Sequence, residues 1–183
     1  MNIKPIETIY KGYRFRSRLE ARWAVFFDTL GIEYEYEPEG YEFDDGTRYL
    51  PDFLLKNTEG RTKGDLFVEI KGQNNEIDTI KIQNFSHHFP IVVLGNLPQG
   101  NDMSDIVESV SEEGMKNIQG KLTLFNFETV DGDWFPAHPG VNYNGGFELF
   151  GDDTNYLNFM DEDRTFQAYL KARQARFEFG ETP

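Results

Sequence analysis

Three charged residues interrupt two apolar segments of strand character. Asp52 follows Leu50, while Glu69 and Lys71 belong to the segment Leu66 to Lys71. Because side chains alternate between the two faces of a strand, Glu69 and Lys71 share one face and the apolar residues of their segment share the other. Buried charge is costly unless it is paired or bound to a metal. The pattern therefore predicts a cation site shared by the two carboxylates, with a lysine beside it.

The elements that position these residues are predicted from apolar periodicity and turn signals. Ser17 to Leu30 has one apolar face at helical spacing, a capping box formed by Ser17 and Glu20, and Gly31 at its end. We predict strands over Ile32–Glu37, Tyr49–Leu55, Leu66–Lys71, Pro90–Leu94 and Lys121–Phe127, and further helices over Glu76–Phe85, Met103–Glu113 and Asp161–Phe177. Pro51 is poorly tolerated inside a central strand, so it indicates that strands diverge beside Asp52.

The bulk composition restricts the class of protein. A length of 183 residues favours one main domain with a modest appendage. The absence of cysteine excludes disulfides and thiolate metal sites, and it fits a reducing compartment. No run of about 18 apolar residues is present, which predicts no membrane span, and the first ten residues lack the apolar segment of a secretion signal.

Charge is distributed unevenly along the chain. The net charge of −14 argues against a general polyanion binder. The first 30 residues nevertheless carry six basic and three acidic side chains, against 12 and 29 in the remainder. Lys11, Arg14, Arg16 and Arg18 follow one another without an intervening acidic residue. We interpret them as a phosphate-binding surface, with a solvated basic loop as the alternative.

The composition changes after about residue 130. Residues 131–163 contain no lysine or arginine but many aromatic residues and glycines. This segment is too aromatic for a disordered acidic tail. We therefore predict a core over residues 1–130 and an acidic, aromatic-rich, loop-rich or β-rich appendage over residues 131–183, which ends in an amphipathic helix.

The charged motif and its surroundings resemble a known superfamily. Pro51-Asp52, the 16-residue gap, Glu69-x-Lys71 and Gly72, together with the helix that follows Phe15, are similar to the PD-(D/E)xK nucleases, in particular to small phage and prophage members. The resemblance covers about residues 8–95. It implies an α/β, restriction-endonuclease-like core of order α-β-β-β-α-β, with a central mixed sheet flanked by helices. It also implies a cytoplasmic location in a bacterial or phage-infected cell.

The resemblance implies metal-dependent hydrolysis of DNA phosphodiester bonds, as an endonuclease that uses Mg²⁺ or Mn²⁺. Asp52 would be the principal metal ligand, Glu69 the second, and the carbonyl of Ile70 another. Lys71 would orient or help to deprotonate the attacking water. Glu20 would bind through water or complete a second metal position, although its carboxylate also fits the capping box alone.

Several alternatives remain open at the level of sequence. Asp52 could end a strand at a turn, with Glu69 and Lys71 as an exposed pair on an edge strand. The protein could be a non-catalytic acidic binding or decoy protein, whose C-terminal region contacts a protein partner. It could also be a homodimeric resolvase of branched DNA. The apolar flanks of the motif favour the catalytic interpretation over the exposed pair.

Overall fold

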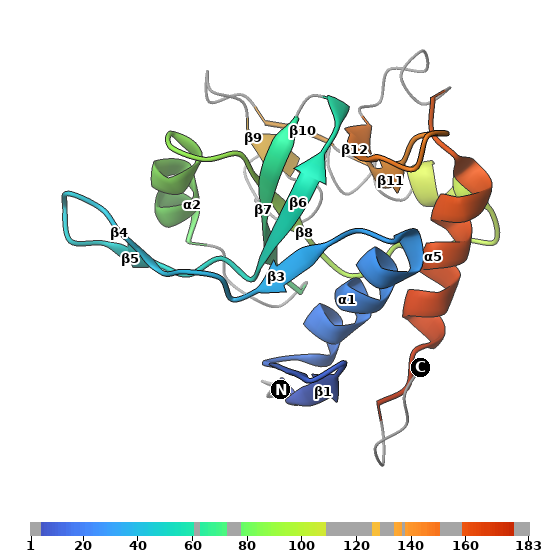
Figure 1. Ribbon diagram of the computed structural model, residues 1–183, viewed down its shortest axis with the longest axis horizontal. Helices are drawn as coiled ribbons and strands as arrows, with labels where there is room; N and C mark the ends of the chain where they lie inside the picture. The colour runs from blue at the N-terminus through green and yellow to red at the C-terminus, as the bar shows by residue number, and fades with distance from the viewer. Residues whose placement is uncertain are drawn as a thin grey trace.

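The protein is a mixed α/β structure built on a six-stranded sheet (Figure 1). The computed structural model describes residues 5–60, 63–72, 78–108, 126–128, 134–136, 138–150 and 159–177. The strand order is β10-β9-β8-β7-β6-β3, in which β7 and β8 are parallel and the other neighbours antiparallel. These strands are β3 (Tyr34–Tyr36), β6 (Phe53–Thr58), β7 (Gly64–Ile70), β8 (Ile91–Leu94), β9 (Asn126–Glu128) and β10 (Trp134–Pro136).

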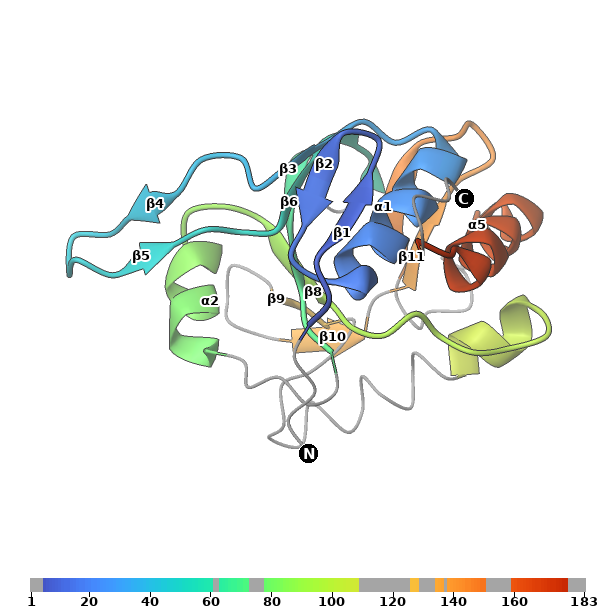
Figure 2. The ribbon, with the colours of Figure 1, turned by 90° about the horizontal axis from the view of Figure 1, so that it is seen from below.

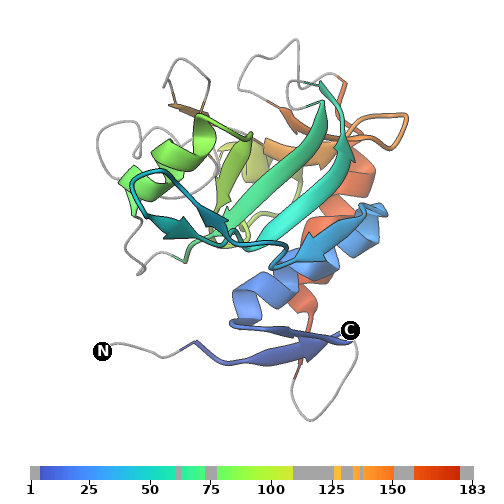
Figure 3. The ribbon, with the colours of Figure 1, turned by 60° about the vertical axis from the view of Figure 1, so that its left-hand side comes forward.

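Helices lie on both faces of the sheet. α1 (Arg18–Leu30) and α5 (Glu162–Gln174) pack side by side on one face, and α2 (Thr79–Ser86) covers the other (Figures 1 and 3). Side chains of β7 alternate accordingly: Val68 belongs to the large core beneath α1, while Phe67 belongs to a smaller cluster beneath α2. This alternation confirms the predicted division of the segment into two faces.

The first helix begins and ends at the predicted residues. Ser17 is its N-cap, and the Ser17 side chain accepts a hydrogen bond from the amide of Glu20. Gly31 ends it with a φ of 77°, a left-handed conformation that costs glycine little. Near the middle of the helix, the indole of Trp23 donates to the carbonyl of Gly95 at 2.7 Å. This bond ties α1 to the residue that follows β8.

The predicted continuous strand Tyr49–Leu55 is wrong. The chain leaves the sheet after β3 and forms a projecting ribbon of β4 (Tyr41–Glu42) and β5 (Arg48–Tyr49), which is prominent in Figure 2. It rejoins the sheet only at β6. Pro51, which lacks an amide donor, lies in the interruption between β5 and β6, whereas the backbone of Asp52 still bonds to Glu37 and Val68.

The N-terminal segment forms a hairpin that the sequence analysis did not predict. Strands β1 (Thr8–Tyr10) and β2 (Tyr13–Phe15) pair through a turn at Lys11 and Gly12 (Figure 2). Both turn residues have positive φ, 46° and 86°. Phe15, at the end of the hairpin, is fully buried in the core that α1 covers. The hairpin therefore leads directly into the first helix.

The C-terminal segment packs on the same core. β10 extends the central sheet, and the antiparallel pair β11 (His138–Val141) and β12 (Phe147–Phe150) lies between that sheet and α5. Tyr169 of α5 is buried against Trp23 and Phe26 of α1. The predicted terminal helix is confirmed over a slightly shorter range.

The remaining predicted elements agree with the described residues in part. β8 matches the predicted Pro90–Leu94, and residues 103–108 are helical at the start of the predicted Met103–Glu113. The start of the predicted helix at Glu76, and most of the predicted strand Lys121–Phe127, lie outside the described residues. Among the described helices, none combines the length and apolar character needed to cross a membrane.

Candidate active site

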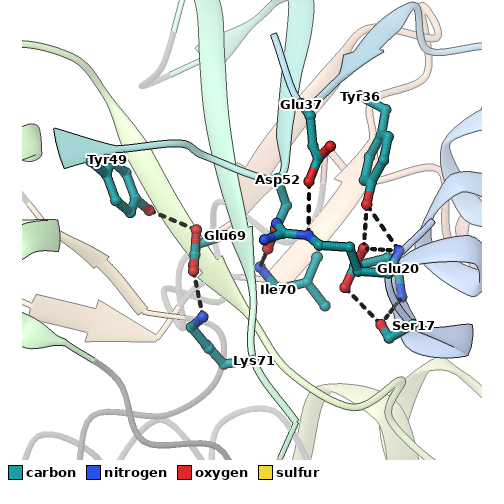
Figure 4. Close-up of polar contacts among 10 residues, drawn as sticks. Ser17, Glu20, Tyr36, Glu37, Tyr49, Asp52, Glu69, Ile70 and Lys71 are labelled. Atoms are coloured by element: carbon teal, nitrogen blue, oxygen red, sulfur yellow. Dashed lines mark hydrogen bonds and ion pairs between the residues drawn. The ribbon is translucent and has the colours of Figure 1, made fainter. Parts of the chain in front are cut away.

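Asp52 and Glu69 lie close together at the point where the ribbon rejoins the sheet (Figure 4). Phe53 pairs with Val68 in the antiparallel register, and Asp52 and Glu69 are the residues next to that pair. The amide of Asp52 also bonds to Val68, donating to its carbonyl at 3.1 Å, so the register is irregular at this point. Both residues are buried, with 3 % and 5 % exposed surface. Since like charges buried close together are destabilising, this pair requires compensation by cations or protons.

The carboxylate of Asp52 replaces a missing strand partner. Its Oδ2 accepts a hydrogen bond from the amide of Ile70 at 2.6 Å. That amide points toward β6, which begins only at Phe53. Its Oδ1 contacts the guanidinium of Arg16. Both oxygens are thus engaged, one by the sheet and one by a cation from the segment before α1.

The surroundings of Asp52 favour its neutral form in the absence of further positive charge. Burial, followed by the charges of Glu69 and Glu20, raises the pKa of Asp52 to about 8. The amide of Ile70 and the guanidinium of Arg16 act in the opposite direction. The site therefore lacks positive charge even with Arg16 in place, which is the electrostatic condition that favours a bound cation.

Glu69 is held from both sides. The hydroxyl of Tyr49 donates to Oε2 at 2.7 Å, and Nζ of Lys71 lies 2.6 Å from Oε1 (Figure 4). Burial, reinforced by the charge of Glu69, raises the pKa of Tyr49 far above its usual value. The Tyr49 hydroxyl consequently remains a donor at all physiological pH values. The Lys71 side chain is one-quarter exposed, so it contacts both the buried Glu69 and the solvent.

Glu20 serves the start of α1. Its Oε1 accepts from the Ser17 hydroxyl at 2.8 Å, and its Oε2 accepts from the Arg16 amide at 3.0 Å and the Tyr36 hydroxyl at 2.7 Å. The capping interpretation is confirmed, although the carboxylate binds the amide before Ser17 rather than that of Ser17. Its charge also acts on Asp52.

Arg16 joins the candidate site to the ribbon. Its Nη2 contacts Asp52, and its Nε lies 2.8 Å from Oε1 of Glu37, the residue where the chain leaves β3. The Arg16 side chain is 54 % exposed, against 5 % for Asp52. The two carboxylates raise the pKa of the guanidinium above its usual value, although burial opposes this, so it is permanently charged.

The other three predicted phosphate-binding residues have different surroundings. Nζ of Lys11 lies 2.9 Å from Oδ1 of Asp28, and Nη1 of Arg14 lies 3.4 Å from Oε2 of Glu7 on the exposed hairpin. Arg18 is half-buried at the start of α1. Ion pairs near the surface, such as these two, contribute little to stability.

The donor set fits a hard divalent cation. Asp52 and Glu69 offer carboxylate oxygens, which Mg²⁺ and Mn²⁺ prefer. A carboxylate has about four lone-pair directions, and each of these two accepts only two contacts from described groups, so each keeps capacity for a metal. Within the described part of the chain, no group of three or more histidine or acidic side chains is arranged to hold a metal. Glu20 therefore does not complete a three-carboxylate cluster.

Three functional candidates were missed by the sequence analysis. Tyr36 and Tyr49 hold Glu20 and Glu69, and Glu37 holds Arg16. The tyrosines occur at the two ends of the ribbon, where the sequence signals only strands. Arg16 was predicted as a phosphate ligand, but its contact with a carboxylate 36 residues away has no local sequence signal.

Comparison of the chain with known protein families and with curated proteins finds no match. The geometry of the site therefore carries the functional argument.

Proposed function

We propose that this protein is a divalent-metal-dependent deoxyribonuclease, an endonuclease with a restriction-endonuclease-like core. The observation that supports this proposal most strongly is the pairing of two buried carboxylates, Asp52 and Glu69, beside the ammonium of Lys71. Such a pair is costly to keep without added positive charge. A cation bound at the end of the sheet, close to a phosphate, provides that charge and explains the arrangement.

Each residue has a distinct proposed role. Asp52 and Glu69 would hold Mg²⁺ or Mn²⁺, with the carbonyl of Ile70 as a further ligand. The bound ion would supply an activated water and stabilise charge on the scissile phosphate. Lys71, one-quarter exposed beside Glu69, would bind the phosphate or the attacking water. The basic residues of the hairpin and of the segment before α1 would bind the DNA backbone.

The direct test is cleavage of linear, nicked, branched and single-stranded DNA by the purified protein in Mg²⁺, Mn²⁺ or a chelator. We expect cleavage in one of the two metals and none in the chelator. Lys71→Met should abolish it, while Lys56→Met should not. Lys56 is a matched control because it is as exposed as Lys71, 24 % against 25 %, but pairs with surface carboxylates. Failure to cut any substrate in either metal would refute the proposal.

A non-catalytic binding protein is the second candidate. It is favoured by the contacts that Arg16 and Lys71 already make with Asp52 and Glu69. This function predicts binding to a protein or nucleic acid that is independent of metal and insensitive to Lys71→Met.

The branched substrate in the same panel also tests a resolvase, which would cut the junction in preference to linear DNA.

A further inference from the structure

Arg16 contacts an oxygen that the proposed metal site would use. We propose that Arg16 is an exchangeable internal cation: it contacts Asp52 in the free protein, and it moves from Asp52 to a DNA phosphate when a divalent ion binds, while Glu37 keeps it beside the site. This inference rests on the proposed function because it concerns the same carboxylate.

The contact geometry permits this exchange. Nη2 of Arg16 contacts Asp52, whereas Glu37 is bound through Nε, a different nitrogen of the same guanidinium. Release of Asp52 therefore does not require release of Glu37. Since the guanidinium is half-exposed and lies on Oδ1 of the buried Asp52, a divalent ion at Oδ1 competes with Arg16 for that oxygen.

Glu37 is fixed at the correct distance by the backbone. Its amide donates to the carbonyl of Asp52 at 2.8 Å, across the base of the ribbon. It adopts a left-handed conformation with a φ of 45°, which is unfavourable for a residue with a side chain. Strain of this kind persists only where the surrounding structure fixes the backbone. The backbone of Glu37 is consequently fixed, which keeps its carboxylate within reach of Arg16.

The backbone of Arg16 is fixed as well. Its amide donates to Oε2 of Glu20 and to the hydroxyl of Tyr36, each at 3.0 Å. Movement is therefore confined to the side chain. A guanidinium that leaves Asp52 presents its planar fork to solvent, and this fork matches the geometry of a phosphate.

If Arg16 and the metal compete for Asp52, removing Arg16 should raise the affinity for the metal, and removing Glu37 should lower it. Calorimetric titration with Mn²⁺, without DNA, should show about tenfold tighter binding to Arg16→Gln than to the wild-type protein. Glu37→Gln should bind Mn²⁺ more weakly, because it removes the partner that holds Arg16 after displacement. The double variant should match Arg16→Gln, since Glu37 acts only through Arg16. Arg16→Lys keeps a competing charge and should stay within about threefold of the wild type.

A second measurement tests the destination of the side chain. Asp52→Asn removes the charge that retains Arg16, so the guanidinium should contact DNA in this variant. The salt dependence of DNA binding by Asp52→Asn should fall by about one unit of log–log slope when Arg16→Gln is added. An unchanged slope would overturn the transfer to phosphate.

The outcomes separate this inference from the proposed function. If Arg16→Gln leaves Mn²⁺ affinity unchanged or weakens it, while Asp52→Asn abolishes binding, the metal site stands and the competition is refuted. If the wild-type protein binds Mn²⁺ no better than Asp52→Asn, the proposed function fails and the inference fails with it. Thermal unfolding of each variant shows whether a lost signal reflects lost folding.

Discussion

Asp52 and Glu69 are neighbours in the site but differ in how their charge is compensated. They lie next to the pair formed by Phe53 and Val68, and both are buried. Glu69 is held by Lys71, two residues further along the chain, and by Tyr49. Asp52 is held by Arg16, which is half-exposed. The Glu69 half of the site is therefore the more closed half, whereas the Asp52 half depends on a contact that can exchange.

Because of this difference, we expect substitutions in the two halves of the site to differ in their effect on stability. Removing a partner from the closed half leaves a buried carboxylate with little access to water, which is costly. Removing Arg16 leaves a carboxylate that a metal or a proton can neutralise instead. We therefore expect substitutions around Glu69 to lower stability as well as metal binding and cleavage, and substitutions around Asp52 to change metal binding and cleavage with little loss of stability.

Asp52→Asn should give a loss of activity as large as that of Lys71→Met, but without a loss of stability. Loss of residues that only support metal ligands typically costs 10- to 100-fold, so loss of a ligand should lower kcat/KM by more than about 100-fold. The melting temperature should stay equal or rise, because the substitution removes a buried charge close to Glu69. Asp65→Asn, on an exposed part of β7, serves as the control. A large loss of stability in Asp52→Asn would contradict this view of Asp52.

Lys71→Met should give the largest loss of stability among the cation variants. It leaves Glu69 buried with Tyr49 as its remaining described partner, and we expect a loss of about 1–2 kcal/mol, limited by the partial exposure of Lys71. Arg16→Gln should cost less than about 1 kcal/mol, since this side chain is half-exposed. Urea denaturation measures both. A greater loss for Arg16→Gln would reverse the comparison.

Tyr49→Phe should have an intermediate effect. It deletes the hydroxyl that donates to Glu69, which should cost about 1 kcal/mol and weaken Mn²⁺ binding by about tenfold. Tyr36→Phe is the matched variant, because Glu20 keeps two other donors, Ser17 and the Arg16 amide. We expect no change in its Mn²⁺ affinity. Calorimetric titration with Mn²⁺ measures both affinities. An equal loss of Mn²⁺ affinity in the two variants would contradict the specific role of Tyr49 beside Glu69.

The sequence predicted those parts of the fold that depend on local signals. Ser17, Gly31 and the apolar spacing between them define α1, and alternation in Leu66 to Lys71 defines the two faces of β7. The hairpin at Lys11 and Gly12 was missed because its strands have three residues each, too few for a periodic pattern. The ribbon was missed for the same reason, since its strands have only two residues each.

The site was predictable in its carboxylates but not in their partners. Asp52, Glu69 and Lys71 stand out because charge interrupts apolar segments, and register then brings them together. The contact between Arg16 and Asp52 depends on where the ribbon rejoins the sheet, which no spacing in the sequence encodes. Tyr49 is buried at that same junction, where its hydroxyl meets Glu69 only after folding.

Glu20→Gln should give the smallest effect and settles the role that the sequence left ambiguous. The amide oxygen can accept from the Arg16 amide and the Tyr36 hydroxyl, while the amide nitrogen can donate to Ser17, so the cap is preserved. We expect a loss of stability below about 0.5 kcal/mol, since glutamine also closes a capping box. Cleavage should fall less than about threefold, because the Glu20 carboxylate already accepts three hydrogen bonds that hold the start of α1. A loss of more than about tenfold at unchanged stability would show that its charge acts in the site, since a capping role alone is worth far less.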